Sequence, residues 1–463
     1  MSILTYIIGI FLTVSFGFLV LRLINNNKFN FYLIEFIIYS FFLGVFLESF
    51  LCFIIGWTGL TINIISILIG NGLFLIFFFL LNLFLKVKQD FKEINFINKF
   101  LKLDIYTKLL VSFALFWLLF KLIIGFVSVI NLPTYQDDSF HNWNMRAKVF
   151  YERESLVLDN NDEDFLGRGY KQYPLTPSIY KTFLMNFSGK WTEGNANFPG
   201  FLYYTLGILL MFFVIFRKTE SIGFSFLGVY LLSSIPLYYI HGTNPYSDVM
   251  MSIYFFIAVY FLYLFVSGKV NILFPILFIG ILGYIKSEGL IIFTTSILLS
   301  LLVLLIIKKH FNKENIINYL KIFSGVLVVN LPFILFKTVY SLGFGNGDAS
   351  IADTSLTLHF EIFYPLYQAL FHTGAYNILP FFFIILIVTW FYKYKKFNKD
   401  SFIFFLSLFI SFSIIIFIYF TTFTFQYVID QTGVNRSMMQ IMYIFIFVFI
   451  LFLYDIVTND GKN

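Results

Sequence analysis

The chain has 463 residues, of which 59% are hydrophobic, 22% are aromatic and only 12% are charged. This composition, with a mean hydropathy of +0.85, excludes a soluble globular protein. The formal net charge of +6 is typical of lysines in the cytoplasmic loops of a membrane protein, so we expect no nucleic-acid partner. The single cysteine, Cys52, excludes an internal disulfide or a thiolate metal site.

Long continuous apolar runs recur along the chain. About 20 apolar residues cross a bilayer as a helix, whereas barrel strands alternate apolar and polar residues over about ten positions. The runs therefore predict an all-α, polytopic transmembrane bundle of about 11 to 13 spans, the lower numbers applying if 271–285 and 289–307 form one broken helix. In chain order the spans are placed near 3–24, 32–56, 60–85, 107–131, 199–216, 221–240, 248–267, 271–285, 289–307, 317–340, 376–392, 401–425 and 437–455.

The distribution of Lys and Arg among the loops predicts the orientation. Basic residues cluster on every second connection, beginning with Arg22 and Lys28, and such loops stay in the cytoplasm. The connections 132–198, 240–248, 286–288, 341–375 and 426–436 are then expected to lie together outside the membrane. The domains predicted are N-terminal transmembrane helices over 1–131, an extracytoplasmic loop over 132–198, and a transmembrane region over 199–463 with an external loop at 341–375.

The 132–198 loop interrupts the membrane pattern with polar, ionisable and aromatic residues. Asp137 and Asp138 follow Pro133 directly after a span, and adjacent carboxylates can share a divalent ion or take a proton from an attacking hydroxyl. The alternative is that Asp138 caps the helix predicted after it. His141 is expected on the same helix face as Asp138.

Two aromatic residues of the same loop have simple structural interpretations. Trp143 is most simply an anchor at the membrane interface. Tyr173 precedes Pro174, and Pro177 follows, so the chain is not expected to continue as a helix there.

Each remaining outward connection holds a group that a plain turn does not need. Asp248 opens a span and could cap it. Lys286 and Glu288 interrupt an apolar run, where a charge costs about 2.5–3.5 kcal/mol at the bilayer centre and normally faces a cavity or a partner. Arg436 could extend its charge to the membrane surface or clamp a phosphate. Together these carboxylates and cations predict an outward-facing site for a lipid-linked phosphate.

Several blocks of the sequence, taken in order, carry a family resemblance. DDSFHNWNMRAKVFY, YPLTP, IHGTNPYSD, GYIKSEG and TGVNRSMMQ resemble motifs of the bacterial polytopic glycosyltransferases with the GT-C fold, a group that includes mannosyltransferase-like enzymes using polyprenyl-phosphate sugars. The resemblance covers about 130–440. The bend reads KSEG and the span motif NPYSD, which departs from the family pattern and leaves donor and acceptor open.

The resemblance implies transfer of a sugar from a polyprenyl-phosphate donor to a glycan, lipid or protein acceptor at the outer face of the cytoplasmic membrane. It implies that Asp138, or else Asp137, is the general base, and that both could hold a divalent cation such as Mg or Mn; no redox cofactor is needed. Lys286 and Arg436 would hold the donor phosphate. The remaining substrate-binding residues would be His141, Trp143, Tyr173, Asp248, Glu288 and Gln440.

Two other functions use similar residues. A transporter or flippase would also place ionisable groups within broken helices. A polymerase or ligase of lipid-linked glycans is chemically close, but its main external loop is expected late in the chain, whereas here the main loop comes early.

Overall fold

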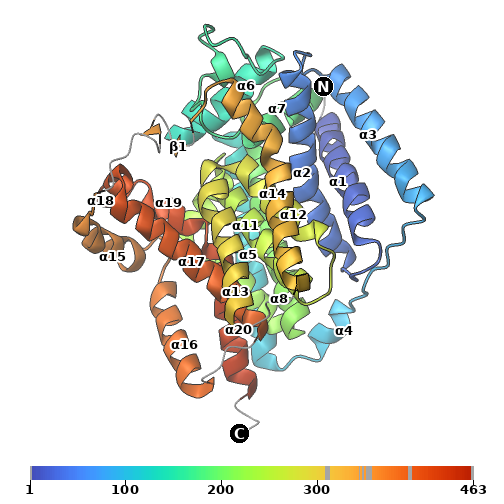
Figure 1. Cartoon of the computed structure of the whole chain (residues 1–463). Coiled ribbons are helices and arrows are strands. Elements are labelled where there is room, and N and C mark those ends of the chain that lie inside the picture. Colours follow the sequence, from blue (N-terminus) through green and yellow to red (C-terminus); the bar gives the residue numbers. More distant parts are fainter. Residues whose placement is uncertain are drawn as a thin grey trace.

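The computed structural model describes residues 3–307, 313–343, 345–346, 349–350, 357–394 and 399–459. Long helices run side by side, with α6, α7 and the N-terminus at one end of the bundle and α4 and the C-terminus at the other (Figure 1). All the described elements are helices except two strands of two residues each, β1 (Gly345–Asn346) and β2 (Ala349–Ser350), which pair with each other. The predicted all-α bundle is therefore confirmed.

The long helices are continuous apolar segments capable of crossing a membrane. Within the described ranges nine helices are long and apolar enough to cross a membrane, or ten if a bent pair of helices counts as one span. They are α1 (Ile3–Asn25), α2 (Leu33–Trp57), α3 (Ile64–Phe84), α5 (Ile105–Asn131), α8 (Glu193–Thr219), α11 (Asp248–Val266), η3 with α13 (Gly289–Thr294 and Thr295–Ile307), α14 (Lys313–Val339) and α17 (Lys399–Thr421).

Shorter helices complete the predicted apolar segments. The bent pair bends by 73° before Pro236, where proline cannot continue the hydrogen-bond ladder. The apolar members are α9 (Ile222–Ser234) with α10 (Pro236–Thr243), α12 (Leu273–Ile285), α16 (Leu379–Tyr394) and α20 (Met442–Asn459). All the predicted spans thus correspond to helices.

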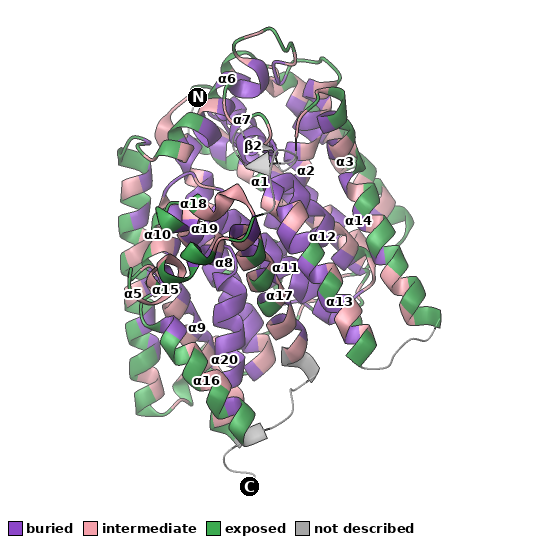
Figure 2. Ribbon diagram, turned by 60° about the vertical axis from the view of Figure 1, so that its left-hand side comes forward, coloured by how far each residue is buried: buried purple, intermediate pink, exposed green. Residues whose placement is uncertain are grey.

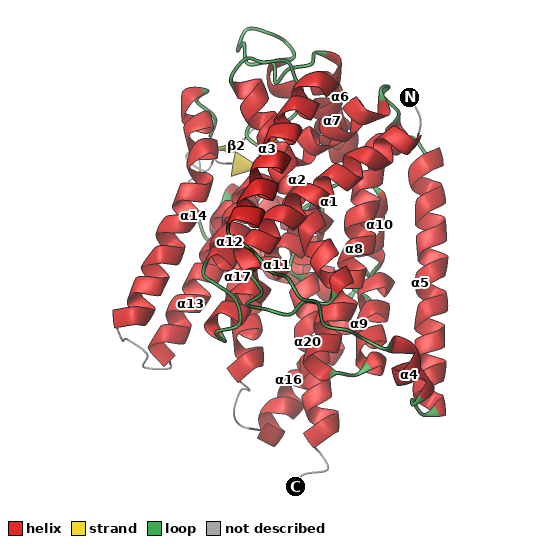
Figure 3. Ribbon diagram, turned by 90° about the vertical axis from the view of Figure 1, so that its right-hand side faces the viewer, coloured by secondary structure: helices red, strands yellow, loops and turns green. Residues whose placement is uncertain are grey.

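The connecting helices lie in three places: α4 at one end of the bundle, α6 and α7 at the other, and α15 and α18 at its side (Figure 1). Figure 3 shows the irregular loop beside α6 and α7 and the extended connection from α3 to α4. These elements are α4 (Phe96–Leu101), η1 (Ser139–Asn144), α6 (Met145–Glu152), η2 (Phe165–Gly167), α7 (Thr176–Ser188), η5 (Phe360–Ile362), α15 (Phe363–Phe371), η6 (Phe423–Phe425), α18 (Gln426–Ile429) and α19 (Val434–Met439).

Burial separates a central group of helices from peripheral ones. In α11, 89% of the most apolar stretch is buried, against 11% in α3, and Figure 2 shows the buried residues gathered in the interior with α3 and α5 exposed along their length. Exposed apolar faces of this length are expected where lipid replaces water as the solvent. The chain is therefore an integral, multi-pass membrane protein.

Small residues allow the first two helices to approach closely. A methyl group on Gly17 would lie 1.8 Å from the Ser40 carbonyl oxygen, and one on Gly44 would lie 1.8 Å from the Thr13 carbonyl oxygen. Backbone contact of this kind stabilises helix pairs in membranes, where the hydrophobic effect contributes little.

The possibility that 271–285 and 289–307 form one broken helix is wrong. The chain reverses at 286–288, so that Thr294 donates to the carbonyl oxygen of Ile279 at 3.4 Å and a methyl group on Gly289 would lie 2.0 Å from the Leu282 carbonyl oxygen. The two segments are an antiparallel helical hairpin. Glycine is required at its tip because any side chain there would collide with the preceding helix.

Helix α7 was not expected from the sequence. It follows Pro174 and begins at Thr176, and all of its residues are buried against α1, α2 and α6. Its polar side chains are buried as well: Ser178 donates to the Trp143 carbonyl oxygen and Thr182 to that of Ala147, so in the sequence this segment resembles the polar loop around it. Pro177 is tolerated because it occupies the first turn of the helix.

Candidate functional site

Asp248 is the centre of a cluster of charged side chains. It is the first residue of α11 and is fully buried. Its Oδ1 accepts from Lys286 Nζ at 2.8 Å and from Gln440 Nε2 at 2.7 Å, and its Oδ2 accepts from Arg436 Nε at 3.2 Å. The Nδ1 atom of His241 also lies 3.2 Å from Oδ2. Asp248 is thus committed to side-chain partners, and the alternative that it caps α11 is wrong.

Lys286 lies at the tip of the hairpin formed by α12 and η3. Only 2% of the residue is exposed, and its ammonium contacts Glu288 Oε1 at 3.1 Å as well as Asp248. Burial by itself lowers the pKa of an ammonium group, but the two carboxylates raise the pKa of Lys286 above its usual value. Lys286 is therefore a buried cation held charged by its neighbours.

Arg436, in α19, links the outer loop to the buried carboxylate. Its guanidinium donates to Asp248 and, through Nη1, to Asp138 Oδ2. It also lies 5.0 Å from the centre of the Tyr246 ring, which stacks on His241 at 4.2 Å. Burial opposes the charge, but Asp248 and Asp138 raise the pKa of Arg436 above its usual value. The alternative that Arg436 only reaches toward the membrane surface is wrong.

Asp138 and Asp137 occupy different surroundings. Asp138 makes no capping hydrogen bond to the helix after it; its side chain is 20% exposed and turned to Arg436. Asp137 is 84% exposed and lies 3.6 Å from His141, which is 66% exposed. The capping alternative for Asp138 is therefore wrong, and His141 pairs with Asp137 and not with Asp138.

Trp143 packs against Tyr173 and makes no contact with the charged cluster around Asp248. The residue is 1% exposed, so its prediction as an anchor at the membrane interface is wrong. Its ring packs 5.4 Å from that of Tyr173, centre to centre. Burial is the largest of the causes that raise the pKa of Tyr173, whose hydroxyl therefore stays protonated.

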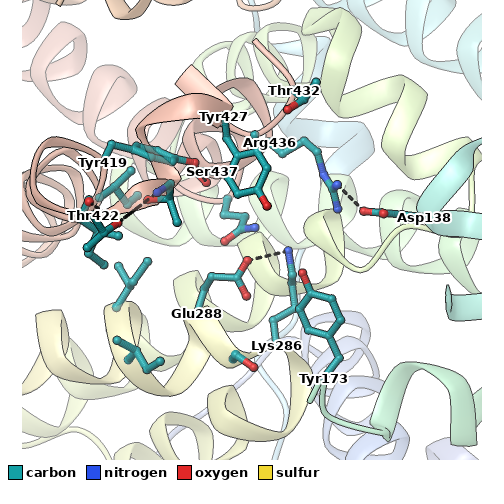
Figure 4. Close-up of a pocket in the computed structure, with 18 of the residues that line it drawn as sticks. Asp138, Tyr173, Lys286, Glu288, Tyr419, Thr422, Tyr427, Thr432, Arg436 and Ser437 are labelled. Atoms are coloured by element: carbon teal, nitrogen blue, oxygen red, sulfur yellow. Dashed lines mark hydrogen bonds and ion pairs between the residues drawn. The ribbon is translucent and has the colours of Figure 1, made fainter. Parts of the chain in front are cut away.

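These side chains border a cavity of about 510 Å³. Figure 4 shows Lys286, Glu288 and Tyr173 on one wall, with Arg436 and Asp138 beside them and Tyr419, Tyr427 and Ser437 opposite. Its apolar part comes from η3 and α17. The lining residues are Asp137, Asp138, Tyr170, Tyr173, Lys286, Ser287, Glu288, Ile291, Ile292, Ile415, Ile418, Tyr419, Thr422, Phe423, Thr424, Tyr427, Thr432, Gly433, Arg436, Ser437 and Gln440.

Most of the residues predicted for the site come together here. Asp137, Asp138, Tyr173, Lys286, Glu288, Arg436 and Gln440 line the cavity, and Asp248 lies directly behind it. His141 and Trp143 do not line it. Sequence reasoning missed the wall of hydroxyl groups, for example the Tyr419 hydroxyl 2.7 Å from Ser437 Oγ. These residues lie at the end of an apolar span without a pattern that separates them from interfacial residues.

Several of the predicted external connections contact one another. Lys337 donates to the carbonyl oxygens of Gln172 and Gly343 at 2.7 and 2.9 Å, and Gln431 donates to that of Pro365 at 2.8 Å. The part of the 341–375 loop that includes Gly347 lies outside the described residues. The side of the membrane that this end faces stays a prediction.

The donor atoms needed for a metal ion are sparse. Among the described residues no group of three or more His, Cys, Asp or Glu side chains could hold a metal ion. Asp138, the better placed of the two predicted ligands, already accepts from Arg436. The residues present therefore fit a divalent cation poorly.

Comparisons with known proteins identify the fold. No family model and no curated protein sequence matches the chain. Its structure is similar to the crystal structure of ArnT from Cupriavidus metallidurans in the apo state, with a TM-score of 0.50 and 12% sequence identity over 74% of this chain. The likeness covers 59% of the ArnT chain, so this protein matches little more than half the length of that relative. At this identity the likeness supports the GT-C-like fold alone.

Proposed function

We propose that this protein is a membrane glycosyltransferase that moves a sugar from a polyprenyl-phosphate donor to a glycan, lipid or protein acceptor. The observation that carries the proposal is the composition of one cavity. Its polar end holds Lys286, Arg436 and their carboxylate partners, and its other end is lined by Ile291, Ile415 and further apolar residues. A phosphate headgroup with a lipid tail has the same distribution of polarity. The GT-C-like fold agrees with this function.

The two cations suit the donor phosphate. The Lys286 ammonium has three N–H donors and uses two on Asp248 and Glu288, and the Arg436 guanidinium has five donors in a planar fork. Both therefore keep donors for phosphate oxygens. When the bond between the sugar C1 and the phosphate oxygen breaks, negative charge grows on the phosphate, and fixed cations stabilise this charge more in the transition state than in the ground state.

Asp138 is the proposed base. Its Oδ2 is held by Arg436, and its Oδ1 has no hydrogen-bond partner among the described residues. An acceptor hydroxyl near Oδ1 would give its proton to the carboxylate while its oxygen forms the new bond to C1. The leaving polyprenyl phosphate takes the electron pair of the broken bond. The predicted Mg or Mn ion stays a prediction, and we assign it no step because the donor set fits it poorly.

The proposed location is the cytoplasmic membrane, with the cavity at the outer face among membrane lipids. The basic loops at the opposite end of the bundle support this orientation, since Arg22 and Arg217 lie at the ends of helices there. An acceptor on the outer face would reach the cavity between the 132–198 and 426–436 segments, which both contribute lining residues.

Transfer can be measured with purified protein and radiolabelled decaprenyl-phosphate sugars, scoring label in a membrane acceptor fraction. Replacing Asp138 with Asn should abolish transfer, because the amide cannot accept the proton. Asp137→Asn should lower transfer much less, because that side chain is largely in solvent. If both variants keep full activity, neither Asp138 nor Asp137 is the base. If the wild-type protein moves an unaltered donor lipid across a vesicle membrane without transferring its sugar, the protein is a transporter.

A further inference from the structure

Two consecutive polar groups at the tip of the hairpin lack partners. The Ser287 hydroxyl and Glu288 Oε2 are buried and make no hydrogen bond among the described residues. Both residues line the cavity. A buried carboxylate oxygen without a donor costs about 1–3 kcal/mol or more, so such an atom beside a cavity points to a ligand that supplies the donor.

The position of these two groups relative to Lys286 is fixed. Lys286, Ser287 and Glu288 are the whole of the turn between α12 and η3, and the close approach of Gly289 to Leu282 leaves the turn little freedom. Figure 4 shows Glu288 directed into the cavity toward Lys286. Rotation about the last bond of a glutamate is soft, so a small turn of the whole carboxylate can direct Oε2 to a ligand.

The charges of the cavity limit what this ligand can be. Three lining carboxylates, Asp137, Asp138 and Glu288, face two lining cations, Lys286 and Arg436. The phosphodiester of the donor adds one negative charge and occupies both cations. A further negative charge would meet only carboxylates, and like charges in a partly buried site repel strongly.

We propose that Ser287 and Glu288 recognise the sugar of the donor, with a sugar hydroxyl donating to Glu288 Oε2 and a second bonded to the Ser287 hydroxyl. The site would select a hydroxyl-bearing sugar without a negative charge and disfavour a uronic acid. This inference rests on the proposed function, since Lys286 next to the pair must hold the phosphate. Ser287 and Glu288 would then determine which sugar is transferred.

Equilibrium binding separates the sugar from the phosphate. The probes are decaprenyl phosphate and its mannosyl, glucosyl, galactosyl and glucuronosyl forms, measured by native mass spectrometry on the detergent-purified protein. The variants are Glu288→Gln and Ser287→Ala. Their matched controls are Glu163→Gln, an exposed residue of the outer loop, and Ser324→Ala on the exposed face of α14. Thermal unfolding of each variant reports its folding.

We expect at least one neutral glycosyl form to bind wild-type protein more tightly than bare decaprenyl phosphate does. Glu288→Gln should weaken that form by about tenfold or more, and Ser287→Ala by about threefold to tenfold, as single hydrogen bonds to charged and neutral groups require. Binding of bare decaprenyl phosphate should be kept, or strengthened in Glu288→Gln because Lys286 loses a competing anion. The glucuronosyl form should bind more weakly than the glucosyl form.

Three results would overturn the inference. Equal loss of both bare and glycosylated lipid in the variants would mean that the pair acts through the phosphate or the fold. Recognition of the sugar would be contradicted if wild-type protein bound none of the glycosylated forms more tightly than bare decaprenyl phosphate. It would also be contradicted if the glucuronosyl form bound as tightly as the glucosyl form. Failure of bare decaprenyl phosphate to bind at all would instead reject the proposed function itself.

Discussion

The Lys286 ammonium donates to Asp248 Oδ1 at 2.8 Å across 38 positions of sequence. Lys286 is 2% exposed and Asp248 is fully buried. Because Arg436 donates to the other oxygen of the same carboxylate, one buried anion lies between two cations from different parts of the chain. Separate connections therefore depend on Asp248 for their relative position.

Replacing Asp248 with Asn should destabilise the protein. The amide keeps the shape of the carboxylate but removes its charge, so Lys286 and Arg436 lose their shared partner in a buried site. We expect the free energy of unfolding to fall by about 3 kcal/mol, the lower end for a broken buried pair, because Glu288 and Asp138 still pair with the two cations. Thermal unfolding in detergent measures the change, and Asp159→Asn in the exposed loop is the control. Equal melting temperatures for Asp248→Asn and wild-type protein would contradict the central role of Asp248.

The sequence predicted charged residues of the site better than it predicted their surroundings. Lys286 and Glu288 stood out because ionised groups are rare within apolar runs. His141 was misplaced because η1 is a π-helix, whose wider turn changes which residues share a face. Spacing based on 3.6 residues per turn put His141 beside Asp138, whereas the structure pairs it with Asp137.

Hydropathy located the helices but not their turns. Each apolar run is long enough to be recognised by its composition alone. The reversal between 271–285 and 289–307 depends on contact between Gly289 and Leu282. Such a contact between two helices does not change the mean hydropathy of a sequence window. The buried helix α7 was missed because its polar residues, such as Lys181 and Thr182, made the segment resemble the hydrophilic loop before it, although the structure buries them.

Gly289→Ala should disrupt the hairpin tip. The new methyl group would lie 2.0 Å from the Leu282 carbonyl oxygen, so the backbone must shift, and overpacking of this kind costs about 1–3 kcal/mol or more. Because the shift moves Lys286 and Glu288, transfer should fall together with the melting temperature. Gly72→Ala is the matched control, since a methyl group there meets no atom within 4 Å. A Gly289→Ala protein with the melting temperature and activity of the control would show that the turn is more adaptable than this geometry implies.

Cysteine labelling can test the predicted orientation. Cys52 is buried and is the single cysteine, so a Cys52→Ala protein provides a clean background. Asn160→Cys lies in the exposed loop after α6, and Asn98→Cys lies in the exposed α4 at the opposite end of the bundle. In intact cells an impermeant maleimide should label position 160 and leave position 98 unlabelled until the cells are broken. The reverse pattern would place the cavity on the cytoplasmic side.

Lys181 is a buried lysine of α7 that connects the two segments bearing Asp138 and Asp248. Its ammonium donates to Asn144 Oδ1 at 2.6 Å and to the Pro245 carbonyl oxygen at 3.4 Å. No carboxylate among the described residues forms an ion pair with it. Burial without such a partner lowers the pKa of Lys181 to about 7.

This lowered pKa should make stability depend on pH. Between about pH 7 and the ordinary lysine pKa of 10.5, the unfolded chain binds a proton at Lys181 that the folded protein releases. Stability therefore rises with pH in this interval, by about 1.4 kcal/mol per pH unit from this group, and its destabilising contribution is complete below about pH 7. The free energy of unfolding of wild-type protein minus that of Lys181→Met should accordingly increase by about 2 kcal/mol from pH 7 to pH 9, measured by denaturant unfolding in detergent. Lys148→Met, at an exposed position of α6, is the matched control for removal of a lysine, and a difference that stays constant with pH for Lys181→Met would mean that Lys181 keeps its proton in the folded protein.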